Sequence, residues 1–185
     1  MHLTEAVLAQ LRERYGEPRP LRWEGEVSEQ EFTLAGASAE RRHDVTFFVF
    51  DQAGRLALIR KPSYPPEIWR PPGGGVNPGE DFEAGVRREA VEELGVEIEL
   101  ERFLVSSEAR FTAGEEAIDW RTHVFSARTE EERLDPVDTH EISGARWGTT
   151  AELGGPLRKA MLGTGRALWR YRVALHEAAL AALDA

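Results

Sequence analysis

The chain has 185 residues, no cysteine, 41% hydrophobic residues and a formal net charge of −10. The length fits one domain, the lack of cysteine excludes disulfides and thiolate metal sites, and the acidic excess argues against a general nucleic-acid binder, which needs a basic surface. No apolar run approaches the roughly 18 residues of a membrane span, and the first residues lack a secretory signal, so we expect a cytoplasmic protein without nucleic-acid or membrane partners.

The first third of the chain predicts a helix followed by extended segments. Apolar residues at Leu3, Val7, Leu8 and Leu11 are typical of one face of an amphipathic helix, and Gly16-Glu17-Pro18 would end it. Residues 22–36 suggest one or two exposed strands. Residues 44–50 are rich in β-branched and aromatic side chains, and residues 55–60 follow a turn at 51–54. These two runs predict a β-hairpin whose strands are covered on both faces.

The second half of the chain predicts more strands and then helices. Strands are expected near residues 96–105, 120–127 and 145–147. From Pro156 onward the pattern is helical, with an interruption at 163–165. Leu168, Tyr171, Leu175 and Ala179 then form an apolar stripe. The stripe could cap the domain or meet a second subunit in a homodimer, and we favour the cap.

A glycine-rich loop precedes a well-delimited helix in the middle of the chain. The prolines and glycines of residues 71–75 cannot continue a helix or a central strand, and they let the backbone approach a ligand closely. Asn77-Pro78-Gly79 predicts a second turn. Asp81 is a suitable N-cap for a helix that ends at Leu94, with Gly95 as its left-handed stop.

Three carboxylates share one face of this predicted helix. Glu89, Glu92 and Glu93 stand at positions i, i+3 and i+4, where like charges repel by a few tenths of a kcal/mol. Gly85 lies one turn earlier on the same face, where its missing side chain leaves room. A hard divalent cation would turn the repulsion into binding, and Arg88 could hold one carboxylate in place. Without the loop before it, the same helix would be typical of a solvated surface.

The loop and helix together resemble the signature of the Nudix hydrolases. That signature is Gly, five residues, Glu, seven residues, then Arg-Glu-U-x-Glu-Glu-x-Gly-U, where U is a bulky apolar residue. This chain matches it over 23 residues. The matching positions are Gly74, Glu80, Arg88, Glu89, Ala90, Glu92, Glu93, Gly95 and Val96, and Ala90 is the one smaller-than-expected residue. The resemblance covers about residues 44–153 of a single domain, with helical extensions at 1–43 and 154–185.

The resemblance implies an α/β (α+β) fold, an α/β/α sandwich around a mixed sheet, with additional N- and C-terminal helices. It implies hydrolysis of a diphosphate linkage, by water attack on phosphorus, in a nucleoside diphosphate derivative or a nucleoside triphosphate. Mg²⁺ or Mn²⁺ would be held by Glu89, Glu92 and Glu93 and by the backbone carbonyl of Gly74. Glu89 and Arg88 would serve catalysis.

Other residues are candidates with an ordinary alternative. Glu141, six residues before Trp147, would be the general base or an added metal ligand, as loop glutamates are in related enzymes, or a solvated acid. Arg60, Lys61 and Arg70 flank the loop and would bind substrate phosphates, or be surface charges. The remaining candidates are weaker: Glu115, Glu116 and Asp119 as rival bases, and Trp69 and Phe111 as base-stacking rings for which core packing is favoured.

Two alternative functions stay open. One is hydrolysis of a non-nucleotide diphosphate. The other is a binding or regulatory module without turnover, which the intact signature disfavours. The sequence does not indicate the substrate, because residues 111–114 lack the proline or tyrosine that marks some Nudix subfamilies. His43, His123 and His140 show no close ligand spacing, which disfavours a histidine-based zinc site.

Overall fold

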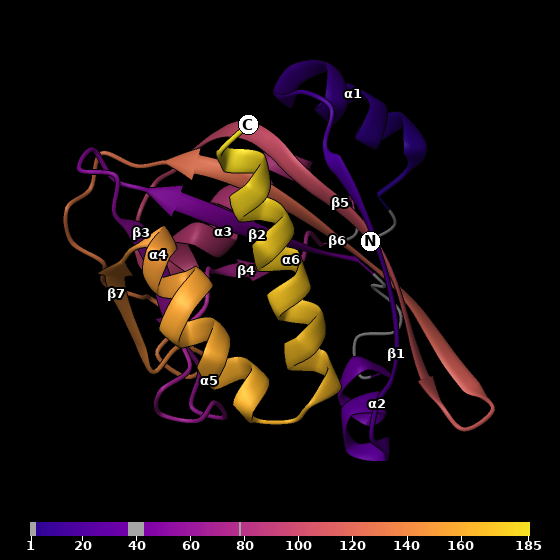
Figure 1. The fold of residues 1–185 in the computed structure, drawn as a ribbon. Coiled ribbons are helices and arrows are strands. Elements are labelled where there is room, and N and C mark those ends of the chain that lie inside the picture. The colour runs from indigo at the N-terminus through magenta and orange to yellow at the C-terminus, as the bar shows by residue number, and fades with distance from the viewer. Residues whose placement is uncertain (1–2, 37–42, 78) are drawn as a thin grey trace.

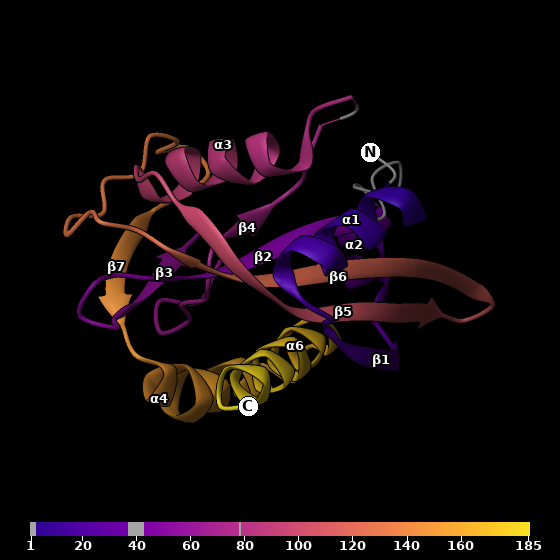
Figure 2. The ribbon, with the colours of Figure 1, turned by 90° about the horizontal axis from the view of Figure 1, so that it is seen from above.

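A mixed seven-stranded sheet lies between helical layers in the computed structural model, which describes residues 3–36, 43–77 and 79–185 (Figure 1; Figure 2). The strand order is β1-β5-β6-β2-β3-β7, and the short β4 pairs with β2. In chain order the elements are α1 (Glu5–Tyr15), β1 (Arg19–Glu26), α2 (Glu29–Gly36), β2 (His43–Phe50), β3 (Leu56–Arg60), β4 (Gly73–Gly74), α3 (Phe82–Leu94), β5 (Glu99–Ala113), β6 (Glu116–Arg128), β7 (Gly144–Gly148), α4 (Thr150–Glu152), the π-helix η1 (Leu153–Leu157), α5 (Arg158–Gly163) and α6 (Ala167–Leu183).

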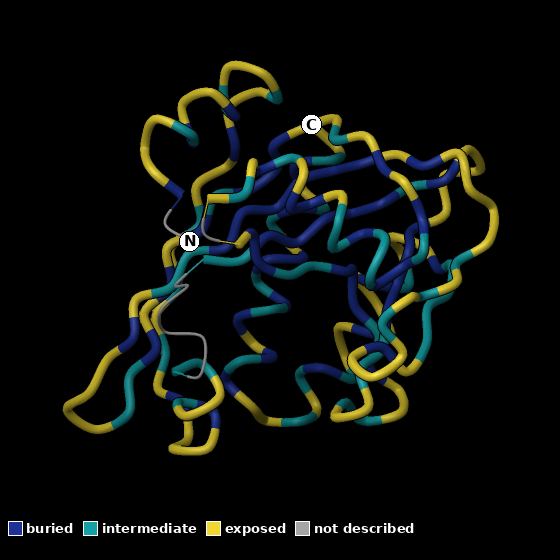
Figure 3. The backbone as a smooth tube through the Cα atoms, turned by 180° about the vertical axis from the view of Figure 1, so that it is seen from behind, coloured by how far each residue is buried: buried dark blue, intermediate teal, exposed yellow. Residues whose placement is uncertain are grey.

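The predicted central hairpin is confirmed, and helices cover it on both faces. β2 pairs antiparallel with β3 and parallel with β6, and Phe47, Phe48 and Val49 are fully buried. Because successive side chains of a strand point to opposite faces, Phe48 packs on the side of α6 while Phe47 and Val49 pack on the side of α3. The sheet therefore separates two apolar layers, and its strands form the buried centre of the molecule in Figure 3.

The predicted helix of the signature is α3, with both of its expected ends. The Asp81 side chain accepts a hydrogen bond from the Ala84 N–H at 3.1 Å, and Gly95 has a φ of 72°. A Cβ at Gly95 would lie 2.0 Å from the Asp135 carbonyl oxygen, so glycine is required for space as well as for conformation. Pro78 of the predicted second turn lies outside the described residues.

The prediction of exposed strands over residues 22–36 was right for β1 and wrong for α2. Ser28 and Glu31 form a capping box: the Glu31 N–H donates to Ser28 Oγ at 3.3 Å, and the Ser28 N–H donates to Glu31 Oε2 at 3.2 Å. The Ser-x-x-Glu spacing was the available signal for a helix start. Glu31 is buried, and its other oxygen accepts the Leu168 N–H at 2.9 Å. α2 is thereby fastened to the start of α6.

The hairpin of β5 and β6 is longer than predicted and projects beyond the helices (Figure 2). Its two strands pair from Glu99 with Arg128 to Ala113 with Glu116, and Gly114 turns with a φ of 60°. The outer half alternates buried residues such as Ala109 and Phe111 with exposed Glu108 and Arg110. This mixed polarity hid the continuation of the strands in the sequence.

The C-terminal helices cover one face of the sheet, which confirms the capping interpretation of the apolar stripe. Tyr171, Leu175 and Ala179 are buried in the layer beneath α6, and Leu168 packs against it. Pro156 lies within η1, immediately before α5, and the break at residues 163–165 separates α5 from α6. In the part of the chain that the structure describes, no helix is long and apolar enough to cross a membrane.

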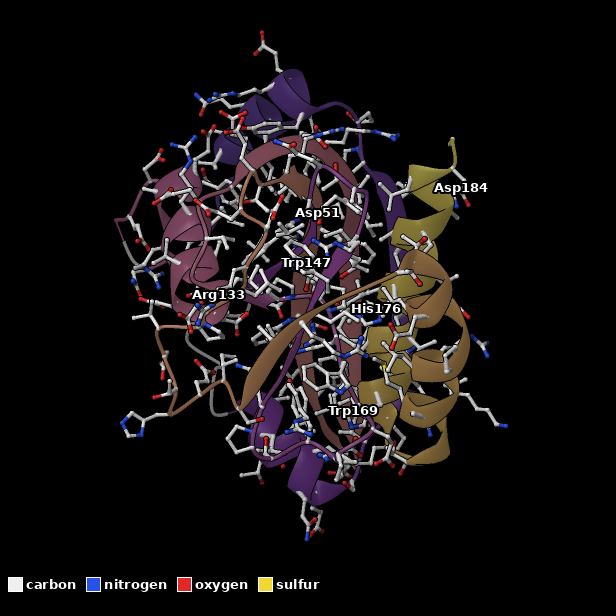
Figure 4. All side chains as sticks on the ribbon, turned by 90° about the vertical axis from the view of Figure 1, so that its left-hand side faces the viewer. Asp51, Arg133, Trp147, Trp169, His176 and Asp184 are labelled. Atoms are coloured by element: carbon white, nitrogen blue, oxygen red, sulfur yellow. The ribbon has the colours of Figure 1, made fainter. Side chains whose placement is uncertain are left out.

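Two buried histidines predict how stability depends on pH. Burial, aided by the charge of His43, lowers the pKa of His123 to about 3. Burial, aided by Arg172 and Arg70, also lowers the pKa of His176, which lies between α6 and the sheet (Figure 4). Since the unfolded chain takes up these protons near the ordinary value of 6.5 and the folded chain does not, stability falls as pH drops below 6.5, by up to about 1.4 kcal/mol per pH unit for each histidine.

The variant His176→Leu isolates one of these two contributions. Nε2 of His176 has no hydrogen-bond partner among the described residues, so stability at pH 7.5 should be equal or higher. The decrease between pH 6.5 and pH 5.5, measured by urea unfolding, should become shallower by about one proton. Phe48→Leu, at the ring that contacts His176, should lower stability without changing this pH dependence. An unchanged slope in His176→Leu would contradict the assignment.

Candidate active site

The candidate site lies in a cavity of about 500 Å³ between the glycine loop, α3 and the helices α2 and α6. Part of its lining is the glycine loop with charged side chains, namely Gly73–Gly75, Glu89, Glu93, Lys61 and Glu141. Another part is mainly aromatic and apolar, with Phe111, Trp120, Leu168 and Tyr171, and it includes the charged Asp44 and Arg172. A ligand that fills the cavity therefore meets both carboxylates and rings.

The glycine loop is shaped by close approaches that leave no room for side chains. A Cβ at Gly74 would lie 2.0 Å from Glu89 Oε2, and a Cβ at Gly73 would lie 2.3 Å from the Val45 carbonyl oxygen. The Gly73 N–H donates to Glu93 Oε2 at 2.7 Å. The loop thus lies directly on the carboxylates of α3.

Arg88 holds the acidic cluster together. Its guanidinium donates to Glu80 Oε1 at 2.9 Å, to Glu89 Oε1 at 3.0 Å and to Glu92 Oε2 at 2.9 Å. A further bond of 3.0 Å reaches the Gly75 carbonyl oxygen. Charge-assisted bonds of this kind fix geometry as well as adding energy. The predicted contact with one carboxylate is in fact a contact with three, and it also anchors the loop.

Gly85 makes room for packing within the motif. A Cβ there would lie 2.8 Å from a methyl carbon of Val76 and 2.9 Å from Glu80 Oε2. The missing side chain therefore admits Val76 and Glu80, which brings Glu80 within reach of Arg88.

The carboxylates suit a divalent cation in their chemistry but are not yet gathered around one. Burial raises the pKa of Glu89, Glu93 and Glu92 act in the same direction, and Arg88 opposes them. Arg88 alone faces Glu80, Glu89 and Glu92, so it does not offset their charge, and carboxylate oxygens are the donors that Mg²⁺ takes. Within the described residues, no three acidic or histidine side chains already converge as a metal site, because Arg88 holds Glu89 and Glu92.

Glu93 is the buried member of the cluster. Its side chain is 2% exposed, and Oε1 lies 3.4 Å from Lys61 Nζ and 4.0 Å from Arg70 Nη2. Arg70 is itself buried and donates to the Tyr64 hydroxyl at 2.8 Å and to the Pro71 carbonyl at 2.7 Å. The structure thus gives Arg70 three internal partners beside the cavity, while Lys61 lies closer to its opening.

Glu141 meets the cluster from a different segment. Its exposed side chain forms an ion pair with Lys61, the same lysine that approaches Glu93. Its N–H donates to Asp138 Oδ1 at 3.0 Å, which shapes the loop before β7. The rival acids lie elsewhere: Glu115 and Glu116 are at the turn of the projecting hairpin, and Asp119 pairs with Arg110. Of the four, Glu141 alone lines this cavity in the described structure.

The structure separates Arg60 and Trp69 from the cavity lining. Arg60 lies over the Trp69 ring, 5.1 Å from its centroid, and Arg146 lies 4.7 Å from the same ring. Arg60 also donates to Ser143 Oγ at 3.3 Å. Phe111 is buried against Trp23 and Tyr171, which confirms core packing, although one side of it lines the cavity.

Several lining residues were missed in the sequence. They are Asp44, Tyr64, Trp120, Leu168, Tyr171 and Arg172. Tyr64 could have been suspected from its place between Lys61 and Arg70, in a proline-containing loop. The others come from strands and from α6, and nothing in their local sequence indicates that the fold brings them to the glycine loop.

Solved structures of known proteins resemble part of the chain. They include a NUDIX-family hydrolase from Clostridium perfringens (19% identity, 61% of this chain and 84% of that chain, TM-score 0.47) and a MutT protein from Methanosarcina mazei Go1 (20%, 61% and 80%, TM-score 0.45). A third is an Ap4A hydrolase of C. elegans (22%, 69% and 92%, TM-score 0.46).

Sequence comparison gives the stronger result. RNA pyrophosphohydrolases from two strains of Caulobacter vibrioides, NA1000 / CB15N and ATCC 19089 / CIP 103742 / CB 15, are each 30% identical over 141 residues, covering 66% of this chain and 81% of the relative. The NUDIX domain model matches residues 40–168, a range that contains the glycine loop and α3. On this match, and on the motif geometry described above, the chain belongs to the Nudix family of hydrolases.

Proposed function

We propose that this protein hydrolyses a diphosphate linkage in a nucleoside diphosphate derivative or a nucleoside triphosphate, with Mg²⁺ or Mn²⁺ held by Glu89, Glu92 and Glu93. The observation that carries the proposal is the contact of Glu89 and Glu93 with the glycine loop in one cavity with Lys61 and Glu141. Glu92 stands beside this cavity, on Arg88. The family generally uses divalent metals. An organic group joined to the diphosphate would contact the aromatic and apolar part of the cavity lining.

The metal would be bound by carboxylates that now contact basic side chains. Glu89 and Glu92 would have to rotate from Arg88, while Glu93 approaches Lys61 and Arg70. The Gly74 carbonyl is a further candidate ligand. When bound, a divalent cation supplies Lewis acidity to the phosphoryl oxygens and lowers the pKa of coordinated water.

The protein's own residues would position the reactants. The side-chain-free backbone of Gly73–Gly75 lets a diphosphate approach α3. Lys61 would neutralise phosphate charge, and Arg88 would hold the glycine loop on α3 through its bonds to Glu80 and to the Gly75 carbonyl. Glu141 would take the proton from the attacking water, since it comes from a segment separate from the metal ligands. Arg70 would act by orienting Glu93 and Tyr64.

Substrate identity calls for a direct screen. Nucleoside triphosphates, nucleotide sugars, dinucleoside polyphosphates and a short 5′-triphosphorylated RNA should be compared, the last because the Caulobacter relatives are RNA pyrophosphohydrolases. A non-nucleotide diphosphate serves as the alternative substrate class. Hydrolysis of none of these compounds would favour a binding module.

Removal of divalent metal should abolish turnover and leave the fold intact. The reason is the excess of carboxylates around Glu89, which a cation would neutralise. Rates should be measured in excess EDTA and again after Mg²⁺ or Mn²⁺ is restored, with circular dichroism recorded in each state. Full activity in EDTA with an unchanged spectrum would rule out the metal mechanism.

Glu92→Gln and Glu93→Gln should share a catalytic defect and differ in stability. Each should lower kcat by about 100-fold or more, on the scale of losing one preorganised electrostatic contact. Each change removes a negative charge and relieves repulsion along the helix, which by itself would stabilise both variants. Glu93, however, is buried against Lys61 and Arg70. Its loss should therefore cost about 3 kcal/mol, whereas the half-exposed Glu92 should change stability by less than about 0.5 kcal/mol.

Urea unfolding and steady-state kinetics on both variants test this pair. Equal stability of the two variants would contradict the role of the Glu93 ion pairs. Near-normal kcat in either variant would show that the residue changed is not a metal ligand.

Glu141→Gln distinguishes a base from a ligand. If Glu141 is the base, kcat should fall by about 10²–10⁴-fold with little change in metal affinity, and raising the pH should partly restore the rate. If it is a ligand, excess metal should rescue the variant. His140→Gln, on the same exposed loop, should keep the wild-type rate. A Glu141→Gln rate equal to wild type at every metal concentration and pH would leave Glu141 as a solvated acid.

A further inference from the structure

Asp44 lies at the boundary between the sheet and the cavity, on the side of α6. Residues 44, 46 and 48 of β2 share a face: Phe48 packs beneath α6, and Thr46 accepts a hydrogen bond from Arg172 of α6 at 3.3 Å. Asp44 is half-buried and lines the same cavity as the glycine loop. A carboxylate on this mainly apolar face requires a physical reason.

One oxygen of Asp44 is fixed by two donors. Trp120 Nε1 donates to Oδ1 at 3.1 Å, and the Thr122 hydroxyl donates to the same oxygen at 2.5 Å. Thr122 stands directly opposite Asp44 in the pairing of β6 with β2. Among the described residues, no donor forms a hydrogen bond with the other oxygen of Asp44, Oδ2.

A chain of hydroxyl groups stands behind this carboxylate. Thr122 Oγ1 accepts from the Tyr171 hydroxyl at 2.8 Å, and the Tyr171 oxygen lies 2.6 Å from Ser107 Oγ. Ser107 Oγ accepts the Thr122 N–H at 3.0 Å. Because the Tyr171 hydroxyl donates its only hydrogen to Thr122, Ser107 must be the donor to Tyr171. The three hydroxyl groups thus donate in the order Ser107, Tyr171, Thr122, and Thr122 donates to Asp44. Such chains strengthen one another in a poorly solvated interior.

The surroundings of Asp44 suit a flat ring. Trp120, whose indole donates to Asp44, lines the cavity together with the apolar side chains of Leu34 and Leu168. Arg172 adds a positive charge in the same lining. A diphosphate bound at the glycine loop would have its organic group beside these residues, because they and the loop line one cavity.

We propose that Asp44 is a specificity-determining residue, whose carboxylate accepts a hydrogen bond from the exocyclic amino group of a nucleobase seated beside Trp120. The inference rests on the proposed function, since it concerns the organic part of the same substrate. The chain from Ser107 to Thr122 orients the carboxylate and is a positioning device. An oxo group at the same place on the base would face the carboxylate with two acceptors and no donor, so amino-bearing bases are preferred.

Asp44→Asn tests this role with little change of shape. The amide oxygen can still accept from Trp120 and Thr122, while its NH₂ group presents donors where Oδ2 presented an acceptor. Binding of AMP, GMP and IMP should be measured by tryptophan fluorescence in EDTA, without turnover. IMP carries neither the 6-amino group of AMP nor the 2-amino group of GMP. Glu24→Gln, an exposed acid on β1 outside this cavity, is the matched control.

The wild type and Glu24→Gln should bind AMP or GMP about 10-fold more tightly than IMP, the worth of one hydrogen bond to a charged group. Asp44→Asn should lose or reverse this ratio and keep the wild-type unfolding transition. A purely structural role would lower stability and leave the ratio unchanged, which would overturn the proposal. Failure of the wild type to bind any of the three nucleotides, or to discriminate among them, would also overturn it.

A separate turnover measurement keeps the two proposals distinguishable. The diphosphate derivatives of the same bases should be hydrolysed with the same order of preference. Hydrolysis without any dependence on Asp44 would overturn the specificity role and leave the hydrolase proposal standing. Base-dependent binding without hydrolysis would remove the hydrolase proposal and retain Asp44 as the residue that selects the base.

Discussion

The geometry of the site depends on the contact of Arg88 with three carboxylates and one loop carbonyl. The carboxylates of Glu89, Glu92 and Glu93 lie on one face of the helix and repel one another. Nearby cationic side chains offset this repulsion. Arg88 supplies one, and Lys61 and Arg70 supply two more around Glu93. Because Arg88 also bonds to Gly75, the arrangement that neutralises the helix is the one that holds the glycine loop on it. The side chain of Arg88 therefore both offsets the charge of the helix and fixes the conformation of the loop.

The second half of the cavity depends on elements outside the signature. α6 covers the sheet with Tyr171 and Leu175, and α2 reaches the same layer through Phe32 and Ala35. These contacts make one continuous apolar layer from α2 to α6. The signature would thus provide the reaction, and the helices that flank it would provide the shape that receives the organic group.

Local rules accounted for the features that depend on neighbouring residues. The caps at Asp81 and Gly95, the covered hairpin and the apolar stripe of α6 follow from short patterns, and the structure contains each of them. Prediction failed where a long-range contact decides. The shared helix face predicted Glu93 as a metal ligand, but its burial against Lys61 and Arg70 depends on other segments. Asp44 looked like the first residue of a strand, and its role emerges only through Thr122 and Tyr171, which are distant in the sequence.

The buried carboxylate of Glu31 has a consequence for the order in which the molecule is completed during synthesis. It caps α2 through Ser28 and also binds the N–H of Leu168, 137 residues later. The signature segment and most of the sheet leave the ribosome before α6 does, so they can begin to pack early. The contact that fastens α2, between Glu31 and Leu168, forms only after the start of α6 has been synthesised. The glycine loop and α3 can therefore assemble while α6, which forms part of the cavity wall, is still missing. The cavity of a growing chain closes only when α6 is released.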